Sequence, residues 1–188
     1  MVSYTLFMIV KLWWYSLKSS IALEDSVRQS FRAWPWICDN NLHINNANYL
    51  RLMESGRMQW IARSGMLKQM LNKKVNMILA GMNITYRREV KLGTVTDMVT
   101  RLAGWDERWL YYEQTLYLPH ADGPKIAMRA LLRCQLVKGR ELVRPEEAWT
   151  LFGWQVDERP ELPDDFQAWL NAADAAASEI KSIDQANA

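Results

Sequence analysis

Polar residues that can take part in acid–base or nucleophilic chemistry are concentrated in one short run, DNNLHINN, at residues 39–46. Asp39 opens this run and can act as a base or as a direct nucleophile. His43 can act as a general base or can position a substrate by hydrogen bonding. Asn45 or Asn46 suits the N-cap of a following helix, whose unpaired backbone N–H groups can polarise a carbonyl oxygen. The run therefore combines a carboxylate with donors for an oxygen that gains negative charge.

Each of these residues also has a structural interpretation. Asp39 belongs to a residue type that is common in turns, and His43 can be a hydrogen-bonded loop residue. Asn45 and Asn46 can serve only to cap the helix and present its backbone. From the residues alone, both interpretations stay open.

The helix that must position this run is predicted over residues 46–63. Gly56 is costly inside a helix, so its place on the apolar side predicts that another part of the chain packs very close to it. Glu54 and Arg57 stand three residues apart, which allows a helix ion pair. The apolar residues that recur at helical spacing are Tyr49, Leu52, Met53, Gly56, Trp60 and Ile61.

Five segments alternate in the way that strands do, one before this helix and four after it. Turn residues separate the last four segments from one another. The order predicts an α+β fold in which one long helix lies against one face of a curved antiparallel sheet. The predicted strands are residues 26–34, 76–90, 94–105, 108–119 and 125–138.

Charged residues on two of these strands have two interpretations. Arg87, Arg88 and Lys91 can hold the phosphates of a substrate, or they can form a solvated sheet edge. Glu113 lies among aromatic residues and can line a cleft, although a solvated or paired strand residue explains it as well.

The chain divides into a central domain at residues 23–150 and two extensions, residues 1–22 and 151–188. Residues 4–15, YTLFMIVKLWWY, predict a helix or arm that packs on the body or on a partner subunit. The alternative is a peripheral membrane contact through residues 4–18, with Trp and Tyr at the level of the lipid headgroups. An Ala-rich helix is predicted over residues 164–181.

Composition bears on several classes of function. A net charge of +2 argues against nucleic-acid binding by bulk electrostatics. Cys38 and Cys134 stand far apart, and His43 and His120 are the only histidines, so no metal site is predicted. The cysteine usage favours a reducing compartment, and we expect a cytoplasmic protein.

The stretch from Asp39 to Tyr49, with Glu54 and Arg57, resembles hotdog-fold thioesterases of the 4-hydroxybenzoyl-CoA thioesterase type. Their common pattern has an Asp, a His-hydrophobic-Asn-Asn element, a Tyr, and later an acid and an Arg on the helix. The similarity covers about residues 25–150 and includes Tyr86-Arg87-Arg88. It implies a hotdog fold, in which an antiparallel curved sheet wraps around one long central helix.

The same resemblance implies an enzyme that hydrolyses acyl-CoA or acyl-carrier thioesters and needs no cofactor. It assigns catalysis to Asp39, the backbone amide of Asn46 and His43. It also implies a homodimer or a dimer of dimers, with the active site between two subunits. The residues that it implies for substrate binding are Asn45, Tyr49, Glu54, Arg57, Arg87 and Arg88.

The sequence departs from the family pattern at two positions. Ile37 stands where many relatives have a second Asp, and Leu42 stands where many have Gly before the His. Because Leu lacks the access of Gly to positive φ, we expect a different loop path there. Two alternative functions stay open: a non-catalytic binder of acyl thioesters or lipids, and a hotdog enoyl-CoA hydratase. The hydratase order Asp-x-Asn-Pro-aliphatic-His is approached from Asp39 to His43, but without the Pro.

Overall fold

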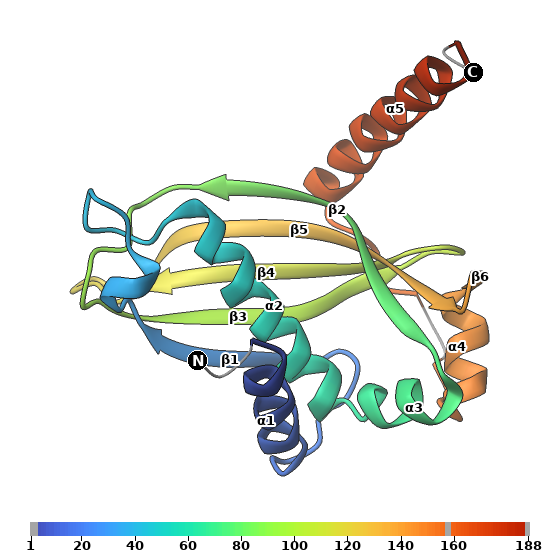
Figure 1. Cartoon of the computed structure of the whole chain (residues 1–188), viewed down its shortest axis with the longest axis horizontal. Helices are drawn as coiled ribbons and strands as arrows, with labels where there is room; N and C mark the ends of the chain where they lie inside the picture. The colour runs from blue at the N-terminus through green and yellow to red at the C-terminus, as the bar shows by residue number, and fades with distance from the viewer. Residues whose placement is uncertain (1–3, 157–158, 187–188) are drawn as a thin grey trace.

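The computed structural model describes residues 4–156 and 159–186. Its centre is an antiparallel sheet in the strand order β1-β3-β4-β5-β2, with β6 paired to β5. One long helix, α2 (Asn46–Arg63), crosses one face of this curved sheet (Figure 1). The predicted α+β architecture and all five predicted strands are confirmed, but β2 ends at Tyr86, so Arg87 and Arg88 lie after the strand and not on it as predicted. The strands are Ser26–Arg32 (β1), Asn76–Tyr86 (β2), Val95–Trp105 (β3), Leu110–Leu118 (β4), Lys125–Lys138 (β5) and Glu141–Val143 (β6).

Gly56 marks the place where α2 approaches the sheet most closely. A Cβ atom added at Gly56 would lie 2.6 Å from Oγ1 of Thr100 and 2.9 Å from Nε2 of Gln114. Met53 and Trp60, one turn before and after, are fully buried. The close packing predicted at Gly56 is therefore confirmed, and it fixes the position of the helix start relative to the sheet.

Further helices lie around this central unit, and the sequence did not predict α3, α4 or β6 (Figure 1). In α1, the Nζ of Lys11 donates to Oγ of Ser55 on α2 at 2.9 Å, so this helix packs on the body, as one of the two interpretations predicted. No helix in the part of the chain described here is long and apolar enough to cross a membrane. These helices are Tyr4–Ser16 (α1), Pro35–Ile37 (η1, a 3-10 helix), Met66–Lys73 (α3), Pro145–Phe152 (α4) and Asp164–Ala186 (α5).

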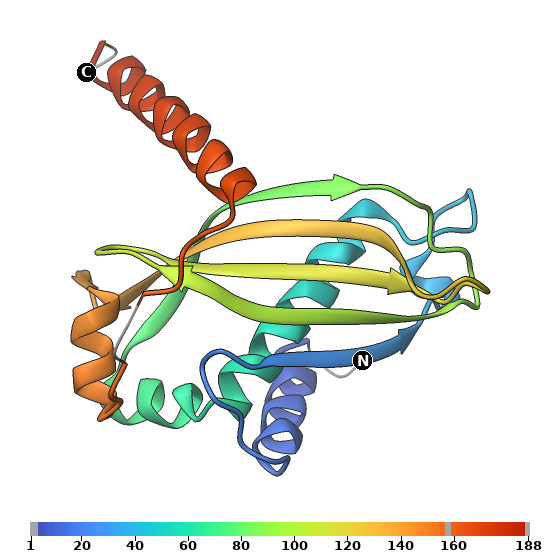
Figure 2. The same ribbon diagram turned by 180° about the vertical axis from the view of Figure 1, so that it is seen from behind.

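The C-terminal helix α5 was predicted over residues 164–181 and extends to Ala186. Its first turns dock on the outer face of the sheet, where Phe166 and Leu170 join a small cluster with Tyr111 and Leu131. The rest of α5 projects away from the body (Figure 2). The predicted domain limit at residue 150 falls inside α4, whose Trp149 belongs to the main core.

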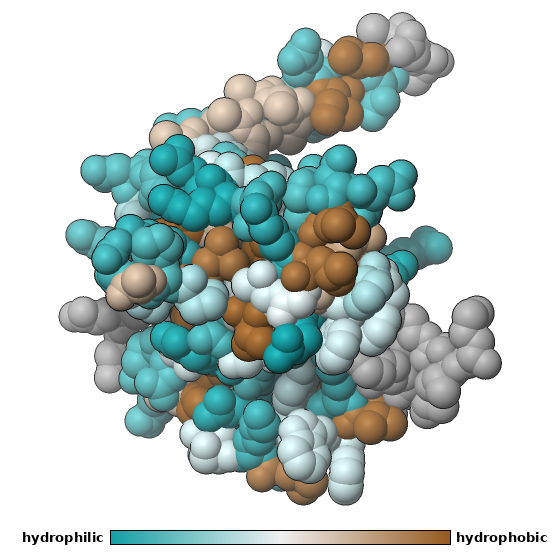
Figure 3. Space-filling model, turned by 90° about the vertical axis from the view of Figure 1, so that its left-hand side faces the viewer, coloured by the Kyte–Doolittle hydropathy of each residue, from teal (hydrophilic) through white to brown (hydrophobic). Residues whose placement is uncertain are grey.

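The loop before α2, the β2–β3 loop and the β4–β5 loop meet at one end of the sheet, on the left in Figure 1. Residues 33–45 and 87–94 lie side by side there, because the amide of Ile44 donates to the carbonyl of Val90 at 3.0 Å. Viewed onto this end, Figure 3 shows hydrophobic patches surrounded by hydrophilic side chains. The run of polar residues from Asp39 to Asn46 lies in this loop cluster.

Candidate functional site

The loop that carries Asp39 is held in a tight turn. The amide of Asp39 donates to the carbonyl of His43 at 2.9 Å, and the amide of Leu42 donates back to the carbonyl of Asp39 at 3.0 Å. Oδ1 of Asp39 accepts from the amide of Asn41 at 2.9 Å. The carboxylate therefore has the local turn contact expected of an Asp and a fixed orientation toward His43.

Leu42 has a left-handed backbone with φ of 59°. The expectation that a leucine would avoid this conformation was wrong at this position. The amide of Leu92 donates to the Leu42 carbonyl at 2.7 Å, and the Leu42 side chain points into solvent, 61% exposed. Hydrogen bonds on both sides of the residue offset a cost of about 1–2 kcal/mol for left-handed backbone without glycine.

Asn45 is the N-cap of α2. Its Oδ1 accepts from the amide of Ala47 at 2.9 Å, with β-region backbone at the cap itself. Asn46 is the first helical residue, so its amide belongs to the first turn, where no acceptor exists within the helix. The positive end of the helix dipole lies at the same place. This start can stabilise negative charge on a nearby oxygen.

The imidazole of His43 stands between two carboxylates. Its Nδ1 lies 3.6 Å from Oδ1 of Asp39, and its Nε2 lies 3.6 Å from Oε2 of Glu89. Lys91 in turn pairs with Glu89 at 3.0 Å. These four residues form a continuous array of ionisable side chains that crosses from the α2 loop to the segment after β2. Sequence reasoning missed Glu89, because backbone pairing between two distant segments, such as that of residues 43 and 91, brings it to the site.

A hollow of about 300 Å³ opens at the start of α2. His43 and Asn46 line one side of it, and Tyr86 and Glu89 line the other. Tyr49 closes the base, 3% exposed, with its ring edge against Tyr86 at a centroid distance of 5.1 Å. Burial, followed by the neighbouring Tyr86 and Cys38, raises the pKa of Tyr49 to about 12. At neutral pH the phenol stays protonated and can donate a hydrogen bond.

A second hollow, of about 370 Å³, follows the same seam between α2 and β2 farther from the loops. Glu54 and Arg57 line it, five and eight residues along α2 from Tyr49, which lines the first hollow. Nη1 of Arg57 donates to Oε1 of the buried Gln114 at 2.9 Å. The other lining residues are mostly apolar and rich in methionine: Leu50, Arg51, Met53, Met58, Met77, Leu79 and Met82.

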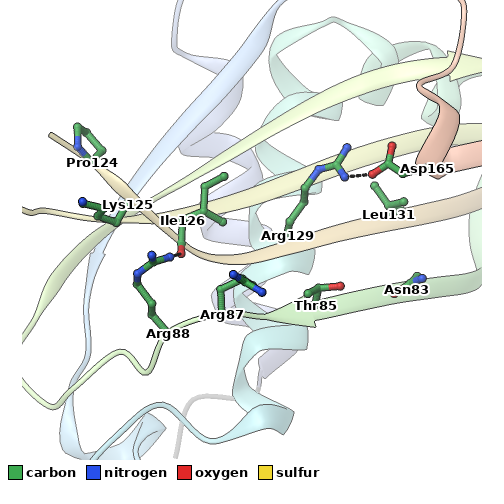
Figure 4. A pocket seen from close by; sticks show the side chains of 10 residues that line it. All are labelled: Asn83, Thr85, Arg87, Arg88, Pro124, Lys125, Ile126, Arg129, Leu131 and Asp165. Carbon is green, nitrogen blue, oxygen red and sulfur yellow. Dashed lines mark hydrogen bonds and ion pairs between the residues drawn. The ribbon is translucent and has the colours of Figure 1, made fainter.

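Arg87 and Arg88 border the first hollow and also a larger cavity of about 560 Å³ on the outer side of the sheet. Lys125 and Arg129 line the same cavity, so four cationic groups gather there (Figure 4). Arg88 is held by a hydrogen bond from Nη1 to the carbonyl of Ile126 at 2.6 Å. Arg129 is paired there with Asp165, which lines the same cavity, so Arg87, Arg88 and Lys125 are the better candidates to contact phosphate groups.

Glu113 does not line a cleft, since it pairs with Arg101 and Arg129 on the neighbouring strands. Its interpretation as a paired strand residue is confirmed. Within residues 4–156 and 159–186, no group of three His, Cys, Asp or Glu residues is placed to hold a metal ion.

The sequence of this chain is similar to those of several known proteins. The chain is 28% identical over 148 residues to Protein THEM6 from Xenopus laevis, covering 79% of this chain and 69% of the relative. It is 25% identical over 145 residues to Thioesterase lcsJ from Purpureocillium lilacinum, covering 65% of this chain and 46% of that protein. The chain thus spans about two thirds of the THEM6 relative and about half of the fungal thioesterase.

Solved structures share the fold at low identity. The 4-hydroxybenzoyl CoA thioesterase from Pseudomonas sp. strain CBS-3 superposes with a TM-score of 0.57 at 15% identity, covering 67% of this chain and 98% of that one. The Staphylococcus aureus protein SAV2348, solved in complex with CoA, superposes with a TM-score of 0.59 at 20% identity, covering 76% of this chain and 94% of that one. These likenesses confirm the hotdog fold. Since the profile of the thioesterase-like superfamily matches residues 33–170, which include both hollows and the loop of Asp39, the chain belongs to that superfamily.

Proposed function

We propose that this protein hydrolyses acyl-CoA-type thioesters to a free acid and a thiol. The observation that carries the proposal is the array of Asp39, His43 and Glu89 beside the amide of Asn46 in the first turn of α2. Hydrolysis needs a group that activates the nucleophile and a donor for the carbonyl oxygen, and both lie at this end of the molecule.

In the proposed reaction the thioester carbonyl lies at the first turn of α2, with its oxygen toward the amide of Asn46. Asp39 either removes a proton from water, which then attacks the carbonyl carbon, or attacks that carbon itself. The C–S bond breaks, and the leaving thiolate takes up a proton to become the free thiol. After direct attack the acyl group is joined to Asp39 as a mixed anhydride, which water then hydrolyses to the free acid and the Asp39 carboxylate. His43, which lines the hollow, can position the water and pass a proton from Asp39 or from solvent to the thiolate.

The methionine-rich hollow and the cationic cavity on the outer side of the sheet suit the two parts of such a substrate. The apolar, methionine-rich hollow between α2 and β2 can accept the acyl group, because methionine adapts to irregular shapes. Arg87 and Arg88, with Lys125 and Arg129 nearby, can hold the phosphates of coenzyme A or of a phosphopantetheine carrier. No cofactor takes part in the proposed reaction.

The test is thiol release from a panel of acyl-CoA substrates. We expect wild-type protein to release thiol, and Asp39→Asn to lower kcat/KM at least 100-fold, since a positioned acid or base contributes about 10²–10⁴-fold. Asp184→Asn is the matched control, because it removes an exposed carboxylate of α5 far from the site. Its activity should equal that of the wild type.

Two other outcomes would assign a different function to the protein. Tight acyl-CoA binding without thiol release from the wild type would make the protein a non-catalytic binder. Hydration of crotonyl-CoA without thiol release would make it a hydratase. If hydrolysis is observed, a single turnover in ¹⁸O-labelled water tests for direct attack, because label found in Asp39 shows that water opened a mixed anhydride at the Asp39 carbonyl carbon.

A further inference from the structure

The helix α1 is attached to the body through polar side chains. Nζ of Lys11 donates to Oγ of Ser55, and the hydroxyl of Tyr15 lies 3.2 Å from the same atom. Gln29 of β1 donates to both oxygens, at 2.9 Å and 3.0 Å. Burial lowers the pKa of Lys11, as expected for an amine turned toward the protein. One side of α1 is therefore fixed against α2 and β1.

The outward side of α1 is apolar over residues 10–17, the part whose side chains the structure describes. Val10, Trp13, Trp14 and Leu17, which directly follows the helix, are exposed there at the spacing i, i+3, i+4, i+7 and form one stripe. Their exposed fractions are 56%, 63%, 58% and 62%. A surface helix normally turns its apolar stripe toward the core. In α1 the polar side faces the body, and the apolar stripe faces outward. We call these four residues the α1 stripe.

The surroundings of the α1 stripe carry a net positive charge, because exposed lysines outnumber the exposed Glu24 and Asp25 of the loop after α1. Neither α1 nor α3 contains an acidic residue. Both helices lie along the same margin of the molecule in Figures 1 and 2. Lys18 follows α1, and Lys68, Lys73 and Lys74 lie exposed on and just after α3. An anionic surface complements this margin, because exposed lysines attract acidic headgroups.

The size of the α1 stripe argues against a second copy as its occupant. Two tryptophans and two aliphatic side chains, each slightly more than half exposed, offer roughly 500 Å², whereas a stable dimer buries about 800 Å² on each partner. A single helix face with paired tryptophans and flanking lysines is instead typical of a segment that lies in the plane of a membrane surface.

We propose that the α1 stripe docks this protein on anionic lipid bilayers. Trp13 and Trp14 lie at the boundary between headgroups and acyl chains, and Val10 and Leu17 extend the contact along the helix. Lys18 and the lysines of α3 contact the acidic headgroups. The contact is peripheral and does not depend on thioester hydrolysis.

The experiment is co-sedimentation of the full chain with vesicles of phosphatidylcholine containing 30% phosphatidylglycerol. We expect the wild type to sediment with these vesicles, and Trp13→Ser/Trp14→Ser to lower the partition coefficient at least tenfold. Trp34→Ser/Trp36→Ser is the matched control, because it removes another exposed tryptophan pair, 48% and 74% exposed, from the opposite end of β1. The partition coefficient of this control should stay within twofold of that of the wild type.

Three results would overturn the proposal. The first is no sedimentation of the wild type. The second is equal sedimentation of the wild type and the α1 variant. The third is light scattering that shows self-association in solution, lost in the α1 variant, without binding to vesicles, which would assign the stripe to a second copy of the chain. Unchanged circular dichroism of both variants serves as the folding check.

Discussion

At the scale of single residues, Gly56 allows α2 to pack closely against the sheet beneath the site. It lies on the buried side of α2, and its missing side chain leaves room for Thr100 and Gln114. Nε2 of Gln114 donates to Oγ1 of Thr100 and to the carbonyl of Met53, both at 2.8 Å. This buried polar contact holds the helix that presents Asn46 and Tyr49.

We predict that Gly56→Ala destabilises the protein by about 2 kcal/mol, because the new methyl group collides with fixed polar atoms. Helix propensity alone predicts that the variant is more stable by about 1 kcal/mol. The sign of the measured stability change therefore shows whether the collision or the propensity dominates. Urea unfolding measures the change. The double variant Gly56→Ala/Thr100→Ala, which removes the nearest atom, should recover part of the loss. A more stable single variant would contradict the close contact.

The residues of the candidate site were predictable only where they share one stretch of chain. Asp39, His43 and Asn46 stand within eight residues, so their proximity follows from the loop and the helix cap. Glu89 joins them through backbone pairing between His43 and Lys91, a tertiary contact that leaves no local signal. The only available hint was the polar cluster of Arg87 to Lys91 after a strand.

At the scale of elements, periodicity predicted the sheet and α2 because each has a buried face with a regular repeat. It could not predict α3 and α4, which are eight residues long and too short for a clear period. The length of α5 was also underestimated. Its distal part lies away from the body, where alanine propensity rather than an apolar pattern extends the helix.

The attachment of α5 includes an ion pair between Arg129 and Asp165. The hydrogen bond from Arg129 lowers the pKa of Asp165 below its ordinary value. A carboxyl group with a lowered folded-state pKa contributes stability above its unfolded value of about 4, and this contribution is lost as the pH falls through the folded value. Docking of α5 should therefore weaken in acid.

We predict that Asp165→Asn lowers the Tm at pH 7 by up to about 3 °C, because partly exposed pairs contribute at most about 1 kcal/mol. At pH 3 the difference between variant and wild type should shrink, since Asp165 is then largely protonated in the unfolded chain. Asp164→Asn is the control for removing one acidic residue from the same helix start. If Asp165→Asn changed the Tm equally at both pH values, a stabilising ion pair between Arg129 and Asp165 would be excluded.

At the scale of the whole molecule, the two edges of the sheet differ. β1 forms one edge, and β2 forms the other beside the apolar seam of α2. Ile78 of β2 is 49% exposed on the side opposite this seam. The distal part of α5 projects beyond the same edge in Figures 1 and 2. An unpaired edge of this length favours pairing with another strand.

We therefore predict a homodimer that pairs through β2, so that both hollows of the seam lie next to the second subunit. Light scattering should give a mass of about twice 22.0 kDa. Ile78→Asp places like charges near each other on the joined strands and should shift the protein toward a monomer. Ser26→Asp puts the same charge on β1 and should leave the dimer intact. A monomeric wild type would require each thioester site to function within one chain.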